Sequence, residues 1–191
     1  MSTPTSPLAY FITFTTYGTR LHGDDRGSVQ RGSCGQERSV LLESRPELHS
    51  FNQSEMDQPP YCLDDGRRRE IVLTTIQEVA RHRGWRVLAV HVRTTHVHCV
   101  VQAEAPPERV MNDFKSYASR RLNEAQLDPP GRKRWVRHGS TLYLWTEESV
   151  WSTVVYTIDE QGDRMAWYVA PEFASASASL HRPDQLPRYP T

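Results

Sequence analysis

Two apolar runs, separated by only three residues, constrain the fold more than any other feature of the sequence. Residues 85–92 read WRVLAVHV and residues 96–102 read HVHCVVQ. Both are rich in β-branched and aromatic side chains, which is typical of strands. The connecting residues Arg93, Thr94 and Thr95 suit a tight antiparallel turn. The sequence therefore predicts a β-hairpin over residues 85–102.

Further strands and helices are expected on both sides of this hairpin. Aromatic and β-branched runs predict strands over residues 10–17 and 141–145. Apolar residues at helical spacing predict helices over residues 68–83, from 106 to about 122, and over 147–161, with a short helix near 40–42. The order of these elements favours an α+β fold. We expect four antiparallel strands covered by helices on one face, a ferredoxin-like or RNA-recognition-motif palm, plus a C-terminal helix that carries functional residues.

The chain as a whole is expected to form one domain. This domain spans residues 8–165 and contains a polar insertion at about 24–66, whereas the Ser- and Pro-rich tail, 171–191, is expected to be disordered. Apolar residues make up 37% of the chain, and no run approaches the roughly 20 that a membrane span requires. The N-terminus lacks the basic start and long apolar core of a secretory signal. Cys34, Cys62 and Cys99 have no paired spacing, so we expect free thiols in a reducing cytoplasm.

The second strand of the hairpin carries a candidate metal site. Because side chains alternate along a strand, His96 and His98 share one face and Val97 and Cys99 the other. Two neutral imidazoles on one face can converge on a divalent cation, and with oxygen ligands such a site suits Mg²⁺ or Mn²⁺. The motif alone favours a polar strand face that happens to carry two histidines, and His91 in the neighbouring strand shows that histidines here can be structural. The helix that follows shifts the interpretation toward a metal site.

The helix expected over residues 147–161 presents a candidate nucleophile. Its apolar stripe comprises Val150, Trp151, Val154, Val155 and Ile158. Tyr156 points about 160° away from the centre of that stripe, so it is not placed for burial. An available tyrosine beside a metal site is a credible nucleophile for phosphoryl transfer. Tyr117 is the rival, but it borders the apolar stripe of its own helix and is better suited to packing.

Several of these pieces occur in the order found in a known family. The chain resembles the HUH single-tyrosine transposases, which include the REP-associated tyrosine transposases. The matching segments are His96-Val97-His98, FKSYASRRLN (114–123), LYLW (142–145), VVYTIDEQG (154–162) and YFITFTTYGTRLHGD (10–24).

This resemblance implies a DNA transposase that cleaves and rejoins single-stranded or hairpin DNA without ATP. Tyr156 would become joined to a 5′ phosphate, with a metal held by His96 and His98, in a homodimer whose active sites combine both subunits. The family often has a further amide ligand four residues after the tyrosine, where this chain has Glu160. We assign Glu160 as the third ligand because it stays beside Tyr156 on a helix, with Gln161 as the alternative if the helix end unwinds.

Two basic segments could contact DNA, although the chain has no net charge, with 23 basic and 23 acidic residues. They contribute Arg120, Arg121, Arg132, Lys133, Arg134 and Arg137, with Trp135 as a base-stacking side chain. The alternative is a solvated surface loop. Two other functions stay open: a metal-dependent nuclease without a covalent intermediate, and a non-catalytic nucleic-acid-binding module. A replication initiator or relaxase is a third, but those enzymes are generally larger.

Overall fold

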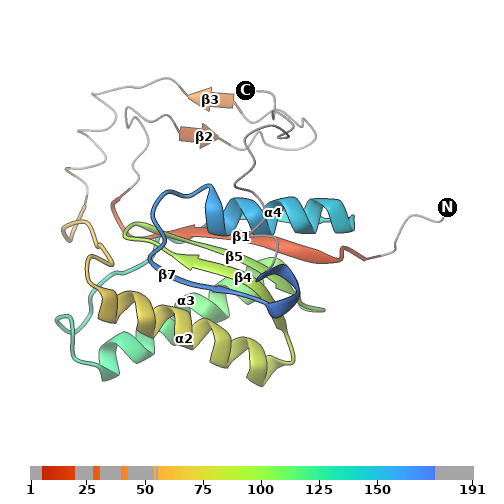
Figure 1. The fold of residues 1–191 in the computed structure, drawn as a ribbon. Coiled ribbons are helices and arrows are strands. Elements are labelled where there is room, and N and C mark those ends of the chain that lie inside the picture. The colour runs from red at the N-terminus through yellow and green to blue at the C-terminus, as the bar shows by residue number, and fades with distance from the viewer. Residues whose placement is uncertain (1–5, 20–27, 31–39, 43–53, 55, 175–191) are drawn as a thin grey trace.

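A five-stranded antiparallel sheet forms the centre of the molecule, with strand order β6-β1-β5-β4-β7 (Figure 1). The computed structural model describes residues 6–19, 28–30, 40–42, 54 and 56–174. The strands are β1 (Ala9–Thr15), β4 (Arg86–Val92), β5 (His96–Gln102), β6 (Ser140–Leu144) and β7 (Ala166–Val169). The helices are α2 (Gly66–Arg83), α3 (Pro107–Glu124) and α4 (Glu147–Asp159). The α+β class is confirmed, but the expected count of four strands is wrong.

The fifth strand, β7, lies beyond residue 165, where the sequence analysis ended the domain. It pairs with β4, so that Trp167 lies opposite His91 and Tyr168 opposite Val90. The strand has only four residues, too few for an alternating pattern to stand out from the loop around it. Residues 171–174, expected in a disordered tail, form a helical turn after this strand, and the rest of the predicted tail lies outside the described residues.

The helices lie on both faces of the sheet, not on one. Figure 1 shows α2 and α3 below the sheet and α4 above it. The lower core contains Ile12, Phe14 and Val97, whereas the upper core contains Leu88, Val100 and Ile158. Because successive strand residues point to opposite faces, these strands present apolar side chains on both sides. The upper apolar surface is covered by α4, which explains why the prediction of helices on one face is wrong.

The predicted hairpin is confirmed, and a third strand extends it. Residue Val92 pairs with Val97, which makes β4 and β5 antiparallel neighbours across a short turn. On the other side of β5, β1 pairs so that Thr13 lies opposite His98 and Thr15 lies opposite His96. Paired residues project to the same face. The histidine pair and these two threonines therefore lie together on the face that carries α4.

The insertion contains extended structure where a short helix was expected. β2 (Ser28–Gln30) pairs with β3 (Val40–Leu42) in a two-stranded sheet, so the predicted helix near residues 40–42 is wrong. A three-residue run is too short for period alone to separate helix from strand. At the end of the insertion, Tyr61 and Leu63 are buried and their backbone N–H groups donate to the carbonyls of Tyr17 and Thr94. This end therefore belongs to the core of the fold.

Among the described residues, no helix is long and apolar enough to cross a membrane.

Candidate active site

The two histidines of β5 lie against one another on the upper face of the sheet. The ring centroids of His96 and His98 are 4.7 Å apart. His98 is 7% exposed, whereas His96 is half-buried. The hydroxyl of Thr13 lies 2.8 Å from Nδ1 of His98, and that of Thr95 lies 3.1 Å from Nδ1 of His96. The shared face predicted from the alternation of β5 is thus confirmed, and each ring has a threonine hydroxyl beside it.

Burial holds His98 in its neutral form. The pKa of His98 is lowered to about 3, first by burial and then by the neighbouring charge of His96, while a side-chain hydrogen bond with Gln161 opposes the shift. A neutral imidazole retains a lone pair on one ring nitrogen. The electrostatics of the site therefore favour the form of histidine that binds cations.

Tyr156 reaches the same place from the helix above. The side chain is 39% exposed. Its ring centroid is nevertheless 5.9 Å from that of His98, and 5.9 Å from that of Phe11 on β1. The Phe11 ring in turn stacks on His98 at 5.4 Å, with 18° between the planes. The three rings therefore form one cluster in which the phenol is accessible and lies beside the buried histidine.

The start of α4 fixes the position of this tyrosine. Thr146 accepts a hydrogen bond from the backbone N–H of Ser149, whose side chain accepts one from the backbone of Thr146, which completes a capping box. The predicted cap and first residue of the helix are confirmed. Val150, Val154 and Ile158 pack on the sheet, as the apolar stripe predicted, but Trp151 is 44% exposed and contacts Phe173 instead.

The end of α4 places Gln161, and not Glu160, in the pocket. The helix stops at Asp159, and Glu160 is its exposed C-cap. Gly162, with φ of 76°, then reverses the chain. Glu160 thus leaves the helical spacing on which its assignment depended, whereas Gln161 turns back toward the site and hydrogen-bonds His98. Among the described residues no cluster of three His, Cys, Asp or Glu side chains is placed to hold a metal ion, so the structure brings His96 and His98 together with Gln161 and not with Glu160, whose assignment as a ligand stays a prediction.

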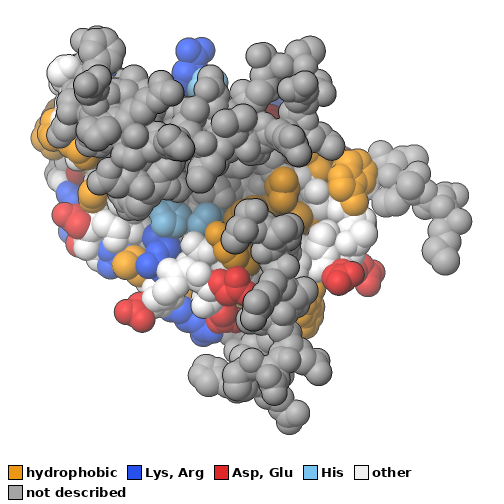
Figure 2. Space-filling model, turned by 90° about the horizontal axis from the view of Figure 1, so that it is seen from above, with side chains coloured by type: hydrophobic (Ala, Val, Ile, Leu, Met, Phe, Trp, Pro, Cys, Tyr) orange, Lys and Arg blue, Asp and Glu red, His pale blue; other side chains and the backbone are white. Residues whose placement is uncertain are grey.

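A single pocket of about 240 Å³ unites these side chains. It is lined by Thr13, Thr15, Thr19, Thr95, His96, His98, Tyr156 and Gln161. Figure 2, viewed onto the face that carries α4, shows histidine side chains reaching the surface beside Lys and Arg side chains. The threonines and Phe11 were not among the site residues predicted from the sequence. The alternation within residues 9–15 could have placed Phe11, Thr13 and Thr15 on one face, but only the strand register places that face beside the histidines.

His91 is a structural histidine. It is fully buried, Nδ1 donates to the carbonyl of Thr157 at 3.0 Å, and Nε2 accepts the backbone N–H of Met165 at 3.1 Å. Burial lowers the pKa of His91. Both ring nitrogens are thus used to connect β4 with the end of α4 and the start of β7, and none is left for a ligand.

Tyr117 lies on the opposite side of the sheet from the pocket. It belongs to α3 and packs against the lower core, with the guanidinium of Arg120 stacked on its ring at 5.0 Å. The expected packing role of Tyr117 is confirmed.

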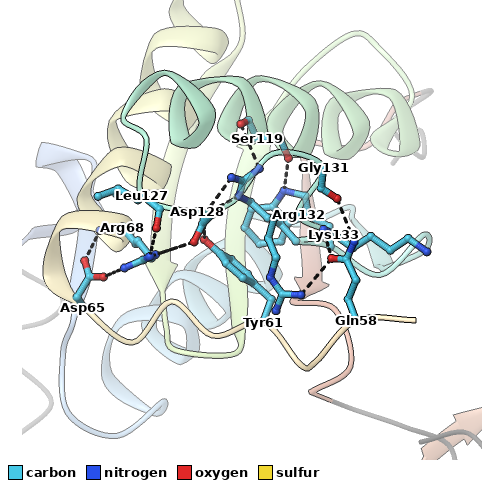
Figure 3. A network of polar contacts seen from close by, with 12 residues as sticks. Gln58, Tyr61, Asp65, Arg68, Ser119, Leu127, Asp128, Gly131, Arg132 and Lys133 are labelled. Atoms are coloured by element: carbon cyan, nitrogen blue, oxygen red, sulfur yellow. Dashed lines mark hydrogen bonds and ion pairs between the residues drawn. The ribbon is translucent and has the colours of Figure 1, made fainter. Parts of the chain in front are cut away.

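Much of the predicted DNA-binding loop is engaged within the protein. Arg134 is 3% exposed, and its Nε donates to Asp128 at 3.0 Å. Asp128 also accepts hydrogen bonds from Arg68 and from the Tyr61 hydroxyl, which ties this loop to α2 and to the end of the insertion (Figure 3). Trp135 packs edge-on against Phe14. Arg134 is therefore internal and Trp135 is half-buried against the lower core, and contact of these side chains with DNA stays a prediction.

The remaining basic side chains differ in how far contacts within the protein already occupy them. Arg132 donates to the carbonyls of Pro59 and Pro60, and Lys133 forms an ion pair with Asp57. Arg121 bridges Glu78 and Glu124 on the outer surface of α2 and α3. Arg120 and Arg137 are exposed, and the backbone next to Arg137 hydrogen-bonds Thr15 through Val136 at 3.1 Å. Of the six predicted residues, Arg137 lies one residue after a backbone contact with Thr15, which lines the pocket.

Comparisons with known proteins show what this region is similar to. The family model described as "Transposase IS200 like" matches residues 62–154. Among curated proteins, none matches the chain. One similar solved structure is a REP-associated tyrosine transposase bound to a REP hairpin, with 11% identity and a TM-score of 0.44 over 81% of this chain and 67% of that one. A second is a candidate transposase from Deinococcus radiodurans R1, with 14% identity and a TM-score of 0.40 over 87% of this chain and 98% of that one.

The matched region begins just before α2 and contains the histidine pair and the first two turns of α4. It ends two residues before Tyr156. Residues 62–154 of this chain are therefore similar to IS200-like transposases, in agreement with the resemblance that the motifs of the sequence carry.

Proposed function

We propose that this transposase cleaves and rejoins single-stranded DNA through a covalent bond between Tyr156 and a 5′ phosphate. One observation carries the proposal. His96, His98, Tyr156 and Gln161 line one pocket within a single chain. The family match supports the reaction class, since it assigns the region around the histidines to transposases. DNA recombination by transposition is the biological outcome that this chemistry serves.

The donor set of the pocket suits a divalent cation. Two neutral imidazoles, the amide oxygen of Gln161 and threonine hydroxyls are nitrogen and oxygen donors of the type that Mn²⁺ accepts, and Mg²⁺ shares the oxygen preference. His96, His98 and Gln161 would hold the ion, which when bound neutralises charge on the scissile phosphate.

The residues of the chain perform the covalent step. The phenolic oxygen of Tyr156 attacks the phosphorus and loses its proton to solvent. A new phosphorus–oxygen bond forms as the bond to the 3′ oxygen breaks, and that oxygen takes up a proton to give a free 3′ hydroxyl. Attack of a 3′ hydroxyl on the phosphotyrosine reverses the step and joins strands. One phosphate ester replaces another, so no ATP is needed.

Phe11 and the surrounding threonines orient the groups that react. Phe11 contacts both His98 and the Tyr156 ring, so it limits the positions that the phenol can adopt. The pocket is open at the tyrosine, because 39% of that side chain is exposed. An extended single strand can therefore approach the phenol. Arg137, exposed and close in sequence to the backbone beside Thr15, is the basic side chain best placed to contact its phosphates.

A covalent adduct tests this proposal. The purified protein is incubated with Mn²⁺ or Mg²⁺ and labelled single-stranded oligonucleotides that tile the DNA on each side of its gene, and the products are separated under denaturing conditions. We expect a protein–DNA adduct and a free 3′ hydroxyl, both lost in Tyr156→Phe and in His98→Ala. Tyr117→Phe is the matched control and retains the adduct.

The same experiment separates the other functions. Cleavage that persists in Tyr156→Phe would identify a nuclease without a covalent intermediate. Binding that survives in a His96→Ala/His98→Ala double variant, with no metal-dependent nicking by the wild-type protein, would identify a non-catalytic DNA-binding module.

A further inference from the structure

Both histidines of the pocket are contacted at the same ring nitrogen by a threonine. Nδ1 of His98 lies 2.8 Å from the Thr13 hydroxyl, and Nδ1 of His96 lies 3.1 Å from the Thr95 hydroxyl. The two threonines come from different places. Thr13 faces His98 across the β1–β5 ladder, and Thr95 directly precedes His96. Two independent elements thus place the same group on the same atom of each ring.

We infer that Thr13 and Thr95 are positioning residues that hold both histidines in the tautomer with the proton on Nδ1. A threonine hydroxyl can accept a hydrogen bond as well as donate one. When it accepts from Nδ1–H, the lone pair of the neutral ring lies on Nε2, and the side-chain NH2 of Gln161, which also hydrogen-bonds His98, can donate to that nitrogen when no cation is bound. A histidine that binds a metal usually donates its other ring N–H to a fixed acceptor, which sets the tautomer and the orientation of the ring. The inference rests on the proposed function, because the position of the lone pair on each histidine ring matters only for a pocket that binds a cation.

The surroundings of His98 make its threonine the more important of the two. His98 is 7% exposed, so water has little access to replace a lost hydroxyl. Phe11 lies two residues before Thr13 on the same face of β1 and stacks on the imidazole, which restrains rotation of the ring. The β-branched side chain of Thr13 is itself stiff at χ1. Stacking and the hydroxyl together fix both the plane of the ring and its protonated nitrogen.

His96 is held less firmly. Its ring is half-buried, so water can take the place of the Thr95 hydroxyl. We therefore expect Thr13→Val to weaken cation binding more than Thr95→Val does. This order distinguishes a positioning role from a general loss of polar lining, which would make the two substitutions equivalent.

The tautomer can be measured directly in the metal-free, full-length protein. Long-range ¹H–¹⁵N correlation NMR of the imidazole rings separates a protonated ring nitrogen from one that carries a lone pair. We expect Nδ1 to be protonated in both His96 and His98. A proton on Nε2 of His98 in the wild-type protein overturns the inference.

Cation binding gives the second measurement. Titration with Mn²⁺, followed by the electron paramagnetic resonance signal of the free ion, is expected to show an affinity about 10–100-fold lower in Thr13→Val. Thr13→Ser restores the hydroxyl and should bind within a few-fold of the wild type. Thr75→Val is the control for loss of a threonine hydroxyl away from the pocket, because Thr75 is buried and its hydroxyl donates to the carbonyl of Ile71 within α2.

The outcomes separate this inference from the proposed function. Wild-type affinity in a folded Thr13→Val, as judged by circular dichroism, overturns the inference and leaves the proposed function standing. If the wild-type protein itself binds no Mn²⁺, the proposed metal dependence fails. The inference about the threonines is then decided by the NMR measurement alone, which shows whether Nδ1 of His96 and of His98 carries the proton.

Discussion

Lys115 is a buried amine that holds the backbone beside the pocket. Its side chain lies on α3 and is 6% exposed, and Nζ donates to the carbonyls of Val136 at 3.0 Å, Arg137 at 3.4 Å and His138 at 3.1 Å. This is the stretch of chain that precedes β6 and hydrogen-bonds Thr15. Burial lowers the pKa of Lys115 to about 8.

This shift predicts how stability depends on pH. Between about pH 8 and 10.5 the unfolded chain keeps the proton on Lys115 more fully than the folded chain does. Unfolding then takes up protons, so the contribution of Lys115 to the free energy of unfolding rises with pH across that window. Lys115→Met removes the titrating group at similar volume. Urea denaturation near both ends of the window should show the difference, wild type minus variant, growing with pH. A difference that stays constant or shrinks contradicts the shift.

Single residues also show how far the sequence could predict the site. The alternation of a strand is local, so it placed His96 and His98 on one face. The contacts of His91 with Thr157 and Met165 depend on segments that are distant in the chain, and nothing local separates this structural histidine from the other two. The same holds for Arg134, whose burial against Asp128 cannot be inferred from a run of basic residues.

The last turn of α4 decides which side chain enters the pocket. The helix ends at Asp159, two residues before its predicted end, and Gly162 adopts φ of 76°. This left-handed conformation is favourable only for glycine among common residues. Because the reversal at Gly162 follows directly after Gln161, the conformation of one glycine bears on the position of a candidate ligand.

Two glycine substitutions test this role of the helix end. Gly162→Ala should lower the free energy of unfolding by about 1–2 kcal/mol and weaken Mn²⁺ binding several-fold, because alanine is strained at positive φ. Gly84→Ala is the matched control. Gly84 has φ of 71° at the C-cap of α2, and neither glycine has an atom closer than 3.5 Å to an added Cβ. Both variants should lose similar stability in urea denaturation, but only Gly162→Ala should lose affinity. Equal Mn²⁺ affinity in the two would show that Gln161 does not depend on this turn.

Among the helices and strands, those with a clear local sequence pattern were predicted correctly. The start of α4 was predictable because Thr146 and the acidic residues after it form a local helix signal, and β5 because its pattern is a clean alternation. The face of the sheet on which α4 packs was not predictable. An apolar stripe indicates that one side of a helix is buried, but it does not indicate which surface covers that side. β7 was missed because its four residues are recognised as a strand only through their pairing with β4.

The complete molecule places the candidate nucleophile, Tyr156, and the histidine pair of the candidate metal site in one chain. α4 packs on β4 and β5 of its own sheet, which brings the Tyr156 ring to 5.9 Å from His98. The family resemblance had implied the opposite arrangement, a homodimer in which the tyrosine of one subunit works with the histidines of the other. The homodimer stays a prediction, but the arrangement seen here does not need a second subunit to assemble the site.

Mixing two inactive variants distinguishes these arrangements. Tyr156→Phe retains the histidines and His98→Ala retains the tyrosine, so a site shared between subunits is intact once in each mixed dimer. Random pairing of equal amounts would then restore about a quarter of the wild-type adduct. A site within one chain is never intact in the mixture, so we expect no adduct after the variants are unfolded and refolded together. Wild-type protein taken through the same refolding is the control for recovery. An adduct from the mixture, with none from either variant alone, would show that α4 exchanges between subunits when the protein acts on DNA.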